Sequence, residues 1–105
     1  MRVLLVEDQL QLAESVAQAL KGTGLTVDVL HDGVAADLDL SSEEYAVAIL
    51  DVGLPRMDGF EVAIQVRNDP RLARLPIIMI TSRTGQKHRD RAMAIGVNDY
   101  LGKPY

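Results

Sequence analysis

Short apolar runs alternate along the chain with segments in which apolar residues recur every three to four positions. Short runs bounded by turn residues are typical of buried strands, and the longer period is typical of helices that pack on a sheet. The pattern therefore predicts five strands, at residues 3–6, 25–30, 46–50, 77–80 and 99–101.

Four helices are predicted between these strands. The first has Leu12, Val16 and Leu20 on one face and ends at Gly22, because glycine commonly follows the last turn of a helix. The other three are predicted at residues 34–40, 60–67 and 86–95. Strands that alternate with helices, without repeats or a linker, indicate β-α-β units and a parallel sheet.

Composition narrows the class of protein. The 105 residues, of which 48% are hydrophobic, are expected to form a single α/β domain over residues 1–105, and one Phe and no Trp imply an aliphatic core. The absence of cysteine excludes disulfides and thiolate metal sites and favours a cytoplasmic location. No apolar run approaches the about 20 residues of a membrane span, and the chain begins with a strand rather than a signal sequence, so no membrane association is expected.

Charge is unevenly distributed around the net value of −4. Residues 1–66 contain twelve acidic and three basic residues, whereas residues 67–105 contain eight basic and three acidic ones. The fourth predicted helix and the loop before it carry Arg83, Lys87, Arg89 and Arg91. This segment is either a docking face for an acidic partner or an ordinary solvated helix face. Direct nucleic-acid binding is not expected, because the domain is acidic and lacks a recognition motif.

Polar residues stand where four of the predicted strands end. Glu7 and Asp8 follow the first strand, and Asp51 follows the third. Thr81 follows the fourth strand and Lys103 the fifth. Because right-handed crossovers bring the carboxyl ends of parallel strands to one edge of the sheet, we expect these side chains to converge.

Three converging carboxylates repel one another unless a cation neutralises them. Mg²⁺ prefers oxygen ligands and is predicted here, with Glu7, Asp8 and Asp51 as ligands and a backbone carbonyl from Gly53. A carboxylate can also attack phosphorus and form an aspartyl phosphate. Asp51, central among the acids, is the predicted nucleophile.

Lys103 and Thr81 would assist that reaction. Phosphoryl transfer depends mainly on positioning and electrostatic stabilisation, so a lysine charge and a threonine hydroxyl beside Asp51 are suitable groups. Pro104 is expected to hold the loop after Lys103 in a tight turn, with a cis peptide bond as one option.

Each residue also has an ordinary structural explanation. Asp8 could cap the first helix, and Asp51 could be a turn residue. Thr81 could be a half-buried strand residue, and Lys103 a solvated lysine. The site is favoured by the whole pattern, because all four strand ends carry residues suited to the same chemistry.

Four segments resemble the receiver domain of two-component response regulators: VLLVED (3–8), LDVGLPRMDGFEV (50–62), LPIIMITS (75–82) and GVNDYLGKPY (96–105). The resemblance covers the whole chain and implies a flavodoxin-like fold, with a parallel five-stranded sheet of order 2-1-3-4-5. It also implies a phosphorylation-dependent switch, rather than a turnover enzyme, that accepts a phosphoryl group from a histidine kinase, a phosphotransfer domain or a small phosphodonor.

The resemblance assigns a role to each candidate residue. It implies the phosphoacceptor Asp51, the magnesium-binding pair Glu7 and Asp8, the metal-binding carbonyl of Gly53, the phosphate-sensing pair Thr81 and Lys103, and the aromatic switch Tyr100. In such receivers phosphorylation draws the threonine hydroxyl inward, the aromatic ring follows, and the face around helix four and strand five changes for an output partner. For Tyr100 alone, an ordinary amphipathic residue near a sheet edge is an equally open interpretation.

The chain departs from such receivers in two ways. They usually carry a fifth helix after the Lys-Pro loop, whereas this sequence stops at Tyr105. We therefore expect a bare flank that favours a homodimer; truncation or a helix supplied by a partner would also account for it. In addition, the first two-thirds resemble receivers joined to winged-helix DNA-binding regulators, whereas residues 74–105 resemble receivers fused to chemotaxis-type hybrid kinases, so an engineered chimera is an alternative.

Competing functions fit less well. Phosphatases that resemble the haloacid dehalogenases require a second Asp two positions after the nucleophile, where this chain has Gly53. A flavin-binding protein would need a phosphate loop after the first strand, where Glu7 and Asp8 would repel phosphate. A binding scaffold that takes up no phosphate remains open.

Overall fold

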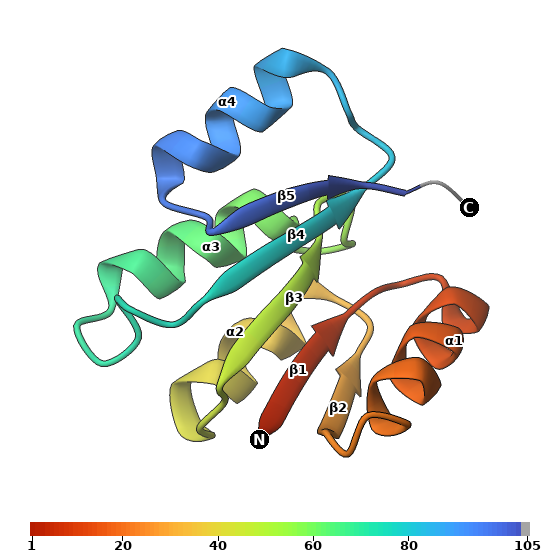
Figure 1. Ribbon diagram of the computed structural model, residues 1–105. Helices are drawn as coiled ribbons and strands as arrows, with labels where there is room; N and C mark the ends of the chain where they lie inside the picture. Colours follow the sequence, from red (N-terminus) through yellow and green to blue (C-terminus); the bar gives the residue numbers. More distant parts are fainter. Residues whose placement is uncertain (104–105) are drawn as a thin grey trace.

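The computed structural model describes residues 1–103, whose sheet is parallel with strand order β2-β1-β3-β4-β5 (Figure 1). The strands are β1 (Arg2–Val6), β2 (Thr26–Leu30), β3 (Val47–Asp51), β4 (Ile77–Thr81) and β5 (Asp99–Gly102). The predicted strands and their order are confirmed. β3 and β4 each end one residue later than the pattern predicted, because their backbone pairing continues by one residue. Asp51 and Thr81 are therefore the last residues of their strands rather than the first residues after them.

All four predicted helices are present within residues 1–103: α1 (Leu10–Lys21), α2 (Gly33–Ser42), α3 (Gly59–Asn68) and α4 (Gln86–Ile95). α3 begins with a capping box, in which the Asp58 carboxylate accepts the Glu61 N–H and the Glu61 carboxylate accepts the Asp58 N–H. α4 ends at Gly96, whose φ of 102° is left-handed. Within the described residues, the helices are too short or too polar to cross a membrane.

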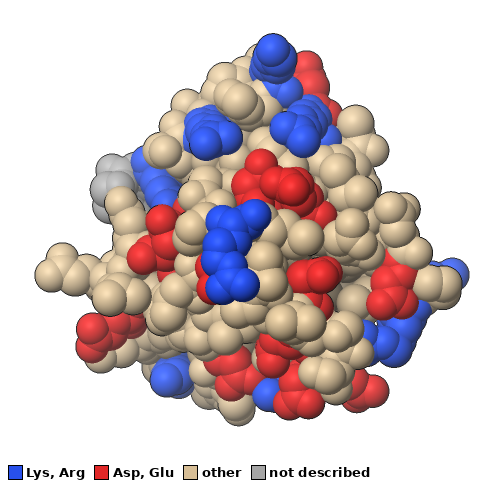
Figure 2. All heavy atoms as spheres, turned by 180° about the vertical axis from the view of Figure 1, so that it is seen from behind, with Lys and Arg blue, Asp and Glu red and all other residues tan. Residues whose placement is uncertain are grey.

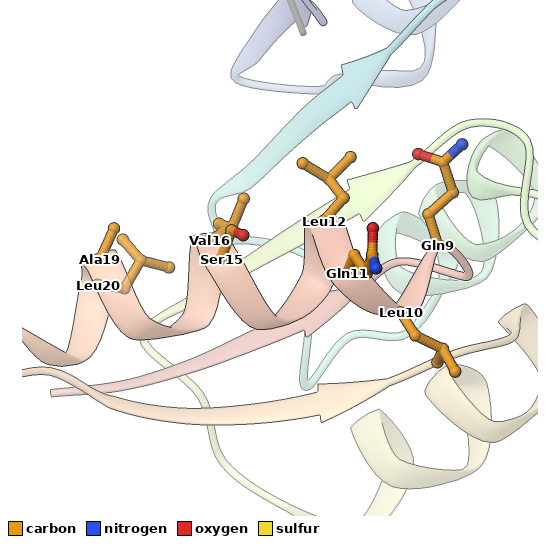
Figure 3. A pocket seen from close by; sticks show the side chains of 8 residues that line it. All are labelled: Gln9, Leu10, Gln11, Leu12, Ser15, Val16, Ala19 and Leu20. Atoms are coloured by element: carbon orange, nitrogen blue, oxygen red, sulfur yellow. The ribbon is translucent and has the colours of Figure 1, made fainter.

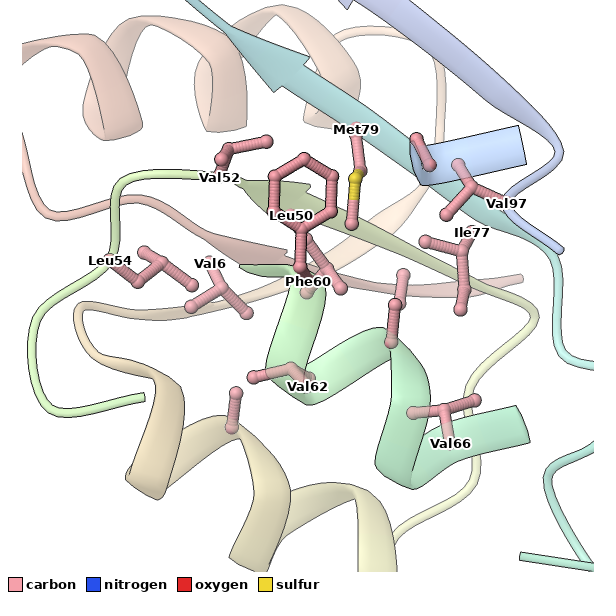
Figure 4. Packing of buried hydrophobic residues seen from close by; sticks show 14 of the residues in the cluster. Val6, Leu50, Val52, Leu54, Phe60, Val62, Val66, Ile77, Met79 and Val97 are labelled. Atoms are coloured by element: carbon pink, nitrogen blue, oxygen red, sulfur yellow. The ribbon is translucent and has the colours of Figure 1, made fainter. Parts of the chain in front are cut away.

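The sheet separates two hydrophobic layers. Alternate residues of β1 face opposite sides: Leu4 belongs to the core cluster under α2, α3 and α4, and Val3 to the cluster under α1. The first cluster is the larger and includes Phe60 and Tyr100; part of it is shown in Figure 4. Three helices therefore cover one face of the sheet and α1 covers the other (Figure 1).

The face on the side of α1 is less completely covered. Val47 and Ile49 of β3 are only partly buried there, and Leu101 of β5 is 46% exposed. A hollow of about 870 Å³ runs along α1 (Figure 3), lined by Gln9, Leu10, Gln11, Leu12, Ser15, Val16, Ala19 and Leu20. Within residues 1–103 this side of the sheet is therefore the uncovered flank.

One arginine ties α3 to the last third of the chain. Arg67 donates through Nε to the Gly96 carbonyl at 3.0 Å, through Nη1 to the Leu75 carbonyl at 2.7 Å, and through Nη2 to Asn98 Oδ1 at 3.0 Å. These bonds fix the start of β4 and the loop from α4 to β5 against the end of α3. They thereby help to set the position of β5 at the edge of the sheet.

Candidate functional site

The predicted convergence at the carboxyl edge of the sheet is present. Lys103 Nζ lies 2.7 Å from Glu7 Oε1 and 3.2 Å from Asp51 Oδ1. One lysine after β5 therefore joins acids that follow β1 and end β3. Residues separated by as much as 96 positions meet in one cluster, as the parallel topology predicts.

Backbone pairing positions these side chains. The Glu7 N–H donates to the Leu30 carbonyl at 3.0 Å, so the chain stays in line with β2 just past the end of β1. The Lys103 N–H donates to the Thr81 carbonyl at 2.8 Å, which keeps the lysine beside the end of β4. The side chains thus start from sheet backbone rather than from long loops.

Burial gives the cluster unusual electrostatics. Glu7 is fully buried; its Oε2 accepts the Gln9 N–H at 3.0 Å. Burial raises the pKa of Glu7, although the bond from Lys103 opposes this rise. Burial alone would lower the pKa of Lys103, but the hydrogen bond to Glu7 and the charge of Asp51 outweigh it and leave that pKa raised. Lys103 is therefore a stable positive charge beside Asp51.

The acidic residues fit a hard cation. Glu7, Asp8 and Asp51 each offer a carboxylate oxygen, and these oxygens lie within 4.8 Å of one another. Among the described residues, the buried Glu7 Oε1 pairs with Lys103 and accepts no other hydrogen bond. An all-oxygen set of this kind suits Mg²⁺ or Mn²⁺ rather than a soft metal.

A polar hollow of about 220 Å³ opens over the cluster. It is lined by Asp8, Gln9, Asp51, Gly53, Thr81, Ser82, Arg83 and Lys103. Five of the predicted residues are among them. Gln9 and Ser82 were not predicted, and Arg83 was predicted only as part of a docking or solvated face. The only signal that could have placed these three at the site was their position next to predicted strand ends. The larger hollow along α1 has no charged side chain in its lining and so offers nothing for this chemistry.

Two of the ordinary explanations are wrong. The Lys103 side chain is only 10% exposed, so it is not a solvated terminal lysine. Gln9 occupies the N-cap position of α1 and makes no side-chain capping bond there. Asp8 is therefore not the N-cap residue of that helix. Thr81 is both a strand residue and part of the hollow. The turn expected at Pro104 lies outside the described residues.

Two glycines allow the loop after Asp51 to pack closely. A Cβ on Gly59 would lie 2.3 Å from the Asp51 carbonyl oxygen, and a Cβ on Gly33 would lie 1.6 Å from the Met57 carbonyl oxygen. Gly33 also donates its N–H to the Pro55 carbonyl at 3.2 Å. Any side chain at either glycine would push the loop away from β3, so both positions help to place Asp51.

Tyr100 is buried near the hollow. Its hydroxyl donates to the Arg83 carbonyl, while the Thr81 hydroxyl accepts the Arg83 N–H at 2.9 Å. Burial raises the pKa of Tyr100, and the nearby Thr81 hydroxyl and the charges of Arg89 and Arg83 oppose this rise. The two residues expected to act as a switch are therefore linked through the backbone of Arg83.

Comparison with known proteins identifies the family. The family profile described as "Response regulator receiver domain" matches residues 3–105. The chain belongs to this family. It is a receiver domain, homologous to response regulators.

Curated relatives match the whole chain. The receiver is 43% identical over 105 residues to the transcriptional regulatory protein TctD of Salmonella typhimurium, covering all of this chain and 46% of that protein. It is 38% identical over 104 residues to the response regulator MprA of Mycobacterium ulcerans, covering 99% of this chain and 44% of that protein. The chain thus spans less than half the length of these relatives.

Solved structures share the fold. The receiver resembles the chemotaxis response regulator CheY4 of Vibrio cholerae with a TM-score of 0.92 and 31% identity, over 99% of this chain and 87% of that one. It also resembles the receiver domain of the sensor histidine kinase PA1611 of Pseudomonas aeruginosa, solved with a magnesium ion in its active-site cleft, with a TM-score of 0.86 and 32% identity over 99% and 85% of the two chains.

Proposed function

We propose that this receiver accepts a phosphoryl group on Asp51. The observation that carries the proposal is the ion pair between Lys103 and Asp51 at 3.2 Å, beside the buried Glu7 and under an open polar hollow. The pairing gives Asp51 a fixed orientation and a permanent positive charge at its side. A surface aspartate in a turn would have neither.

The reaction is a displacement at phosphorus. A carboxylate oxygen of Asp51 forms a bond to phosphorus while the bond from phosphorus to the donor breaks. The leaving group takes the bonding electrons, as imidazole from a phosphohistidine or as acetate from acetyl phosphate. Later attack by water on phosphorus restores the carboxylate and releases inorganic phosphate. The receiver is thus a switch that is set and reset, rather than a turnover enzyme.

Neighbouring groups stabilise the charge on the transferred group. The Lys103 ammonium is within reach of oxygens attached to Asp51, and the Thr81 hydroxyl lines the same hollow and can donate to them. Glu7, Asp8 and Asp51 would hold Mg²⁺ together with the Gly53 carbonyl. When bound, Mg²⁺ would offset the charge of the carboxylates and of the phosphoryl oxygens.

We extend the proposal to the partners. A histidine kinase or a phosphotransfer domain would supply the phosphoryl group, and an output partner would read the face formed by α4 and β5. Tyr100 on β5 would be the aromatic part of the switch, because its hydroxyl donates to Arg83, whose N–H donates to the Thr81 hydroxyl at the hollow. A cytoplasmic location belongs to the same proposal.

The test is intact-protein mass spectrometry after incubation with acetyl phosphate and Mg²⁺. We expect addition of one phosphoryl group to the wild-type chain, and complete loss of that addition in Asp51→Asn and in the presence of a chelator. The matched control is Asp37→Asn, because Asp37 lies on α2 outside the hollow. Equal uptake by the Asp51→Asn variant would refute the assignment.

A second candidate is a binding scaffold that pairs through its uncovered flank without taking up phosphate. It is favoured by the apolar hollow along α1, in which Leu12, Val16 and Leu20 contribute apolar lining (Figure 3). Sedimentation equilibrium would show a homodimer that Val16→Glu abolishes. A monomer at all concentrations that still accepts phosphate would exclude this candidate.

A further inference from the structure

Helix α4 is held in place by few apolar contacts. Of its ten residues only Ala92 is fully buried, and Met93 is 51% exposed. Most of the helix is polar or charged, so hydrophobic burial alone accounts for little of its attachment. Other contacts must fix its position over the sheet.

Two arginines of α4 supply such contacts. The Arg89 guanidinium carbon lies 5.3 Å from the centre of the Tyr100 ring, and that of Arg91 lies 4.4 Å from the centre of the Phe60 ring. Both are cation–π distances. Figure 2 shows Lys and Arg gathered toward the end of the molecule where α4 lies. Arg89 and Arg91 nevertheless contact aromatic rings of the same chain. The helix is thus attached to β5 on one flank and to α3 on the other.

Arg89 contacts Tyr100 in two ways. Besides facing the ring, its Nη1 donates to the Tyr100 backbone carbonyl at 2.9 Å. A solvated arginine would not make both contacts, because each requires the side chain to be ordered. Among the described contacts, Arg91 meets Phe60 only through the ring, which makes Arg91 a control for the ring contact alone.

The far end of the Tyr100 ring is also held. Its hydroxyl donates to the Arg83 carbonyl in the loop before α4. The ring is therefore fixed at the hydroxyl by this loop and at the backbone by α4 itself. Both attachments are outside the cluster of Glu7, Asp51 and Lys103, and they make the position of α4 depend on where the ring lies.

We propose that Arg89 is a positioning residue that holds Tyr100 in its buried position and couples the ring to α4. The inference rests on the proposed function only in treating the ring as part of the switch. Thr81 and Tyr100 are both hydrogen-bonded to the backbone of Arg83, so a change at the hollow reaches the ring through this residue and, through Arg89, reaches α4. Loss of Arg89 therefore releases the ring and uncouples the helix.

The test follows Tyr100 by ¹⁹F NMR of protein that contains 3-fluorotyrosine. The chain has three tyrosines, and Tyr100→Phe identifies the resonance of Tyr100. Wild type should give a single buried resonance. In Arg89→Met we expect a second, solvent-exposed resonance with at least a threefold larger share than any such signal in wild type, and faster amide exchange in α4. Arg89→Lys, which keeps the charge, should recover much of the wild-type spectrum.

Two controls make the result decisive. Arg91→Met should leave the Tyr100 resonance unchanged, since Arg91 faces Phe60, and Arg89→Gln serves as the second neutral variant if Arg89→Met fails to fold. An unchanged Tyr100 resonance in the folded neutral variant overturns the proposal. Acetyl phosphate labelling separates the two hypotheses: a displaced ring without phosphate uptake by wild type refutes only the phosphoacceptor role, whereas normal uptake with an unmoved ring refutes only the role of Arg89.

Discussion

The two edges of the sheet carry the same kinds of charge in very different surroundings. At the carboxyl edge the group is Lys103 with Glu7, Asp8 and Asp51; at the amino edge it is Arg2 with Asp28, Asp39 and Glu43. Each group has one basic and three acidic side chains. Formal charge therefore does not distinguish the candidate site from a surface cluster.

Burial and hydrogen bonding do distinguish them. At the amino edge the Arg2 side chain is 39% exposed and pairs with Asp28 at 2.6 Å and with Glu43 at 3.1 Å. The Tyr45 hydroxyl donates to Asp39, and burial, then its bonds to Asp39 and Asp28, raise the pKa of Tyr45 well above its usual value. These groups are in or near water and are satisfied by one another, so they have little to offer a ligand.

The carboxyl edge is buried, and its charges are held away from water. Glu7 is fully buried and the Lys103 side chain is 10% exposed, while the hollow gives solutes access to Asp51. Charges held this way are little screened and keep a strong field. The comparison teaches that a site is marked by the burial of its charges, not by their number.

The largest expected effect comes from loop packing at the carboxyl edge. Gly33→Ala should lower the free energy of unfolding by about 3 kcal/mol, because its Cβ would lie 1.6 Å from the Met57 carbonyl and overpacking must move backbone. Gly22→Ala, toward the amino edge, should be nearly neutral, because its Cβ would have no neighbour closer than 3.4 Å. Urea unfolding of both variants measures the difference, and equal losses would contradict the contrast between the edges.

A smaller effect is expected from the cations. Lys103→Met should cost about 2 kcal/mol in urea unfolding at neutral pH, below the about 3–5 kcal/mol of a sealed ion pair, because the hollow admits water and Glu7 can take up a proton. Arg2→Met should not shift the urea midpoint measurably. If Arg2→Met proved the more damaging change, burial would not be what separates the two groups.

The smallest effect is on acid stability. The hydrogen bond from Tyr45, and then Arg2, lower the pKa of Asp28 although burial opposes them. A carboxyl group whose pKa is lowered by folding stabilises the fold above its unfolded pKa, and this contribution disappears as pH falls through the folded value. Asp28→Asn should therefore flatten the acid side of a plot of thermal midpoint against pH, below about pH 4. Asp37→Asn is the control, and identical curves for wild type and Asp28→Asn would contradict this expectation.

Much of the architecture could be predicted because it depends on local pattern. Apolar runs with period two or 3.6 specify strands and helices, and parallel topology then brings Glu7, Asp51 and Lys103 to one edge. One helix end was also within reach, since Gly22, predicted to end the first helix, is the residue that follows α1.

The remaining contacts depend on side chains that meet only in the folded chain. Nothing local to Lys103 indicates that it would be buried against Glu7 rather than solvated. In the same way, the spacing of Arg89 and Arg91 fits a solvated helix face, whereas the aromatic rings that they face belong to β5 and α3. Such contacts depend on the relative placement of whole elements, which sequence periodicity does not specify.

The three hydrogen bonds of Arg67 have a consequence for the lifetime of the folded chain. They join α3 to positions 8, 29 and 31 residues away. We expect the two longer connections to form late in folding, because they close the longest loops. Interactions absent from the folding transition state mainly slow unfolding rather than speed folding. We therefore expect Arg67 to slow the local unfolding of α4 and β5, so that these elements stay attached for longer between successive opening events.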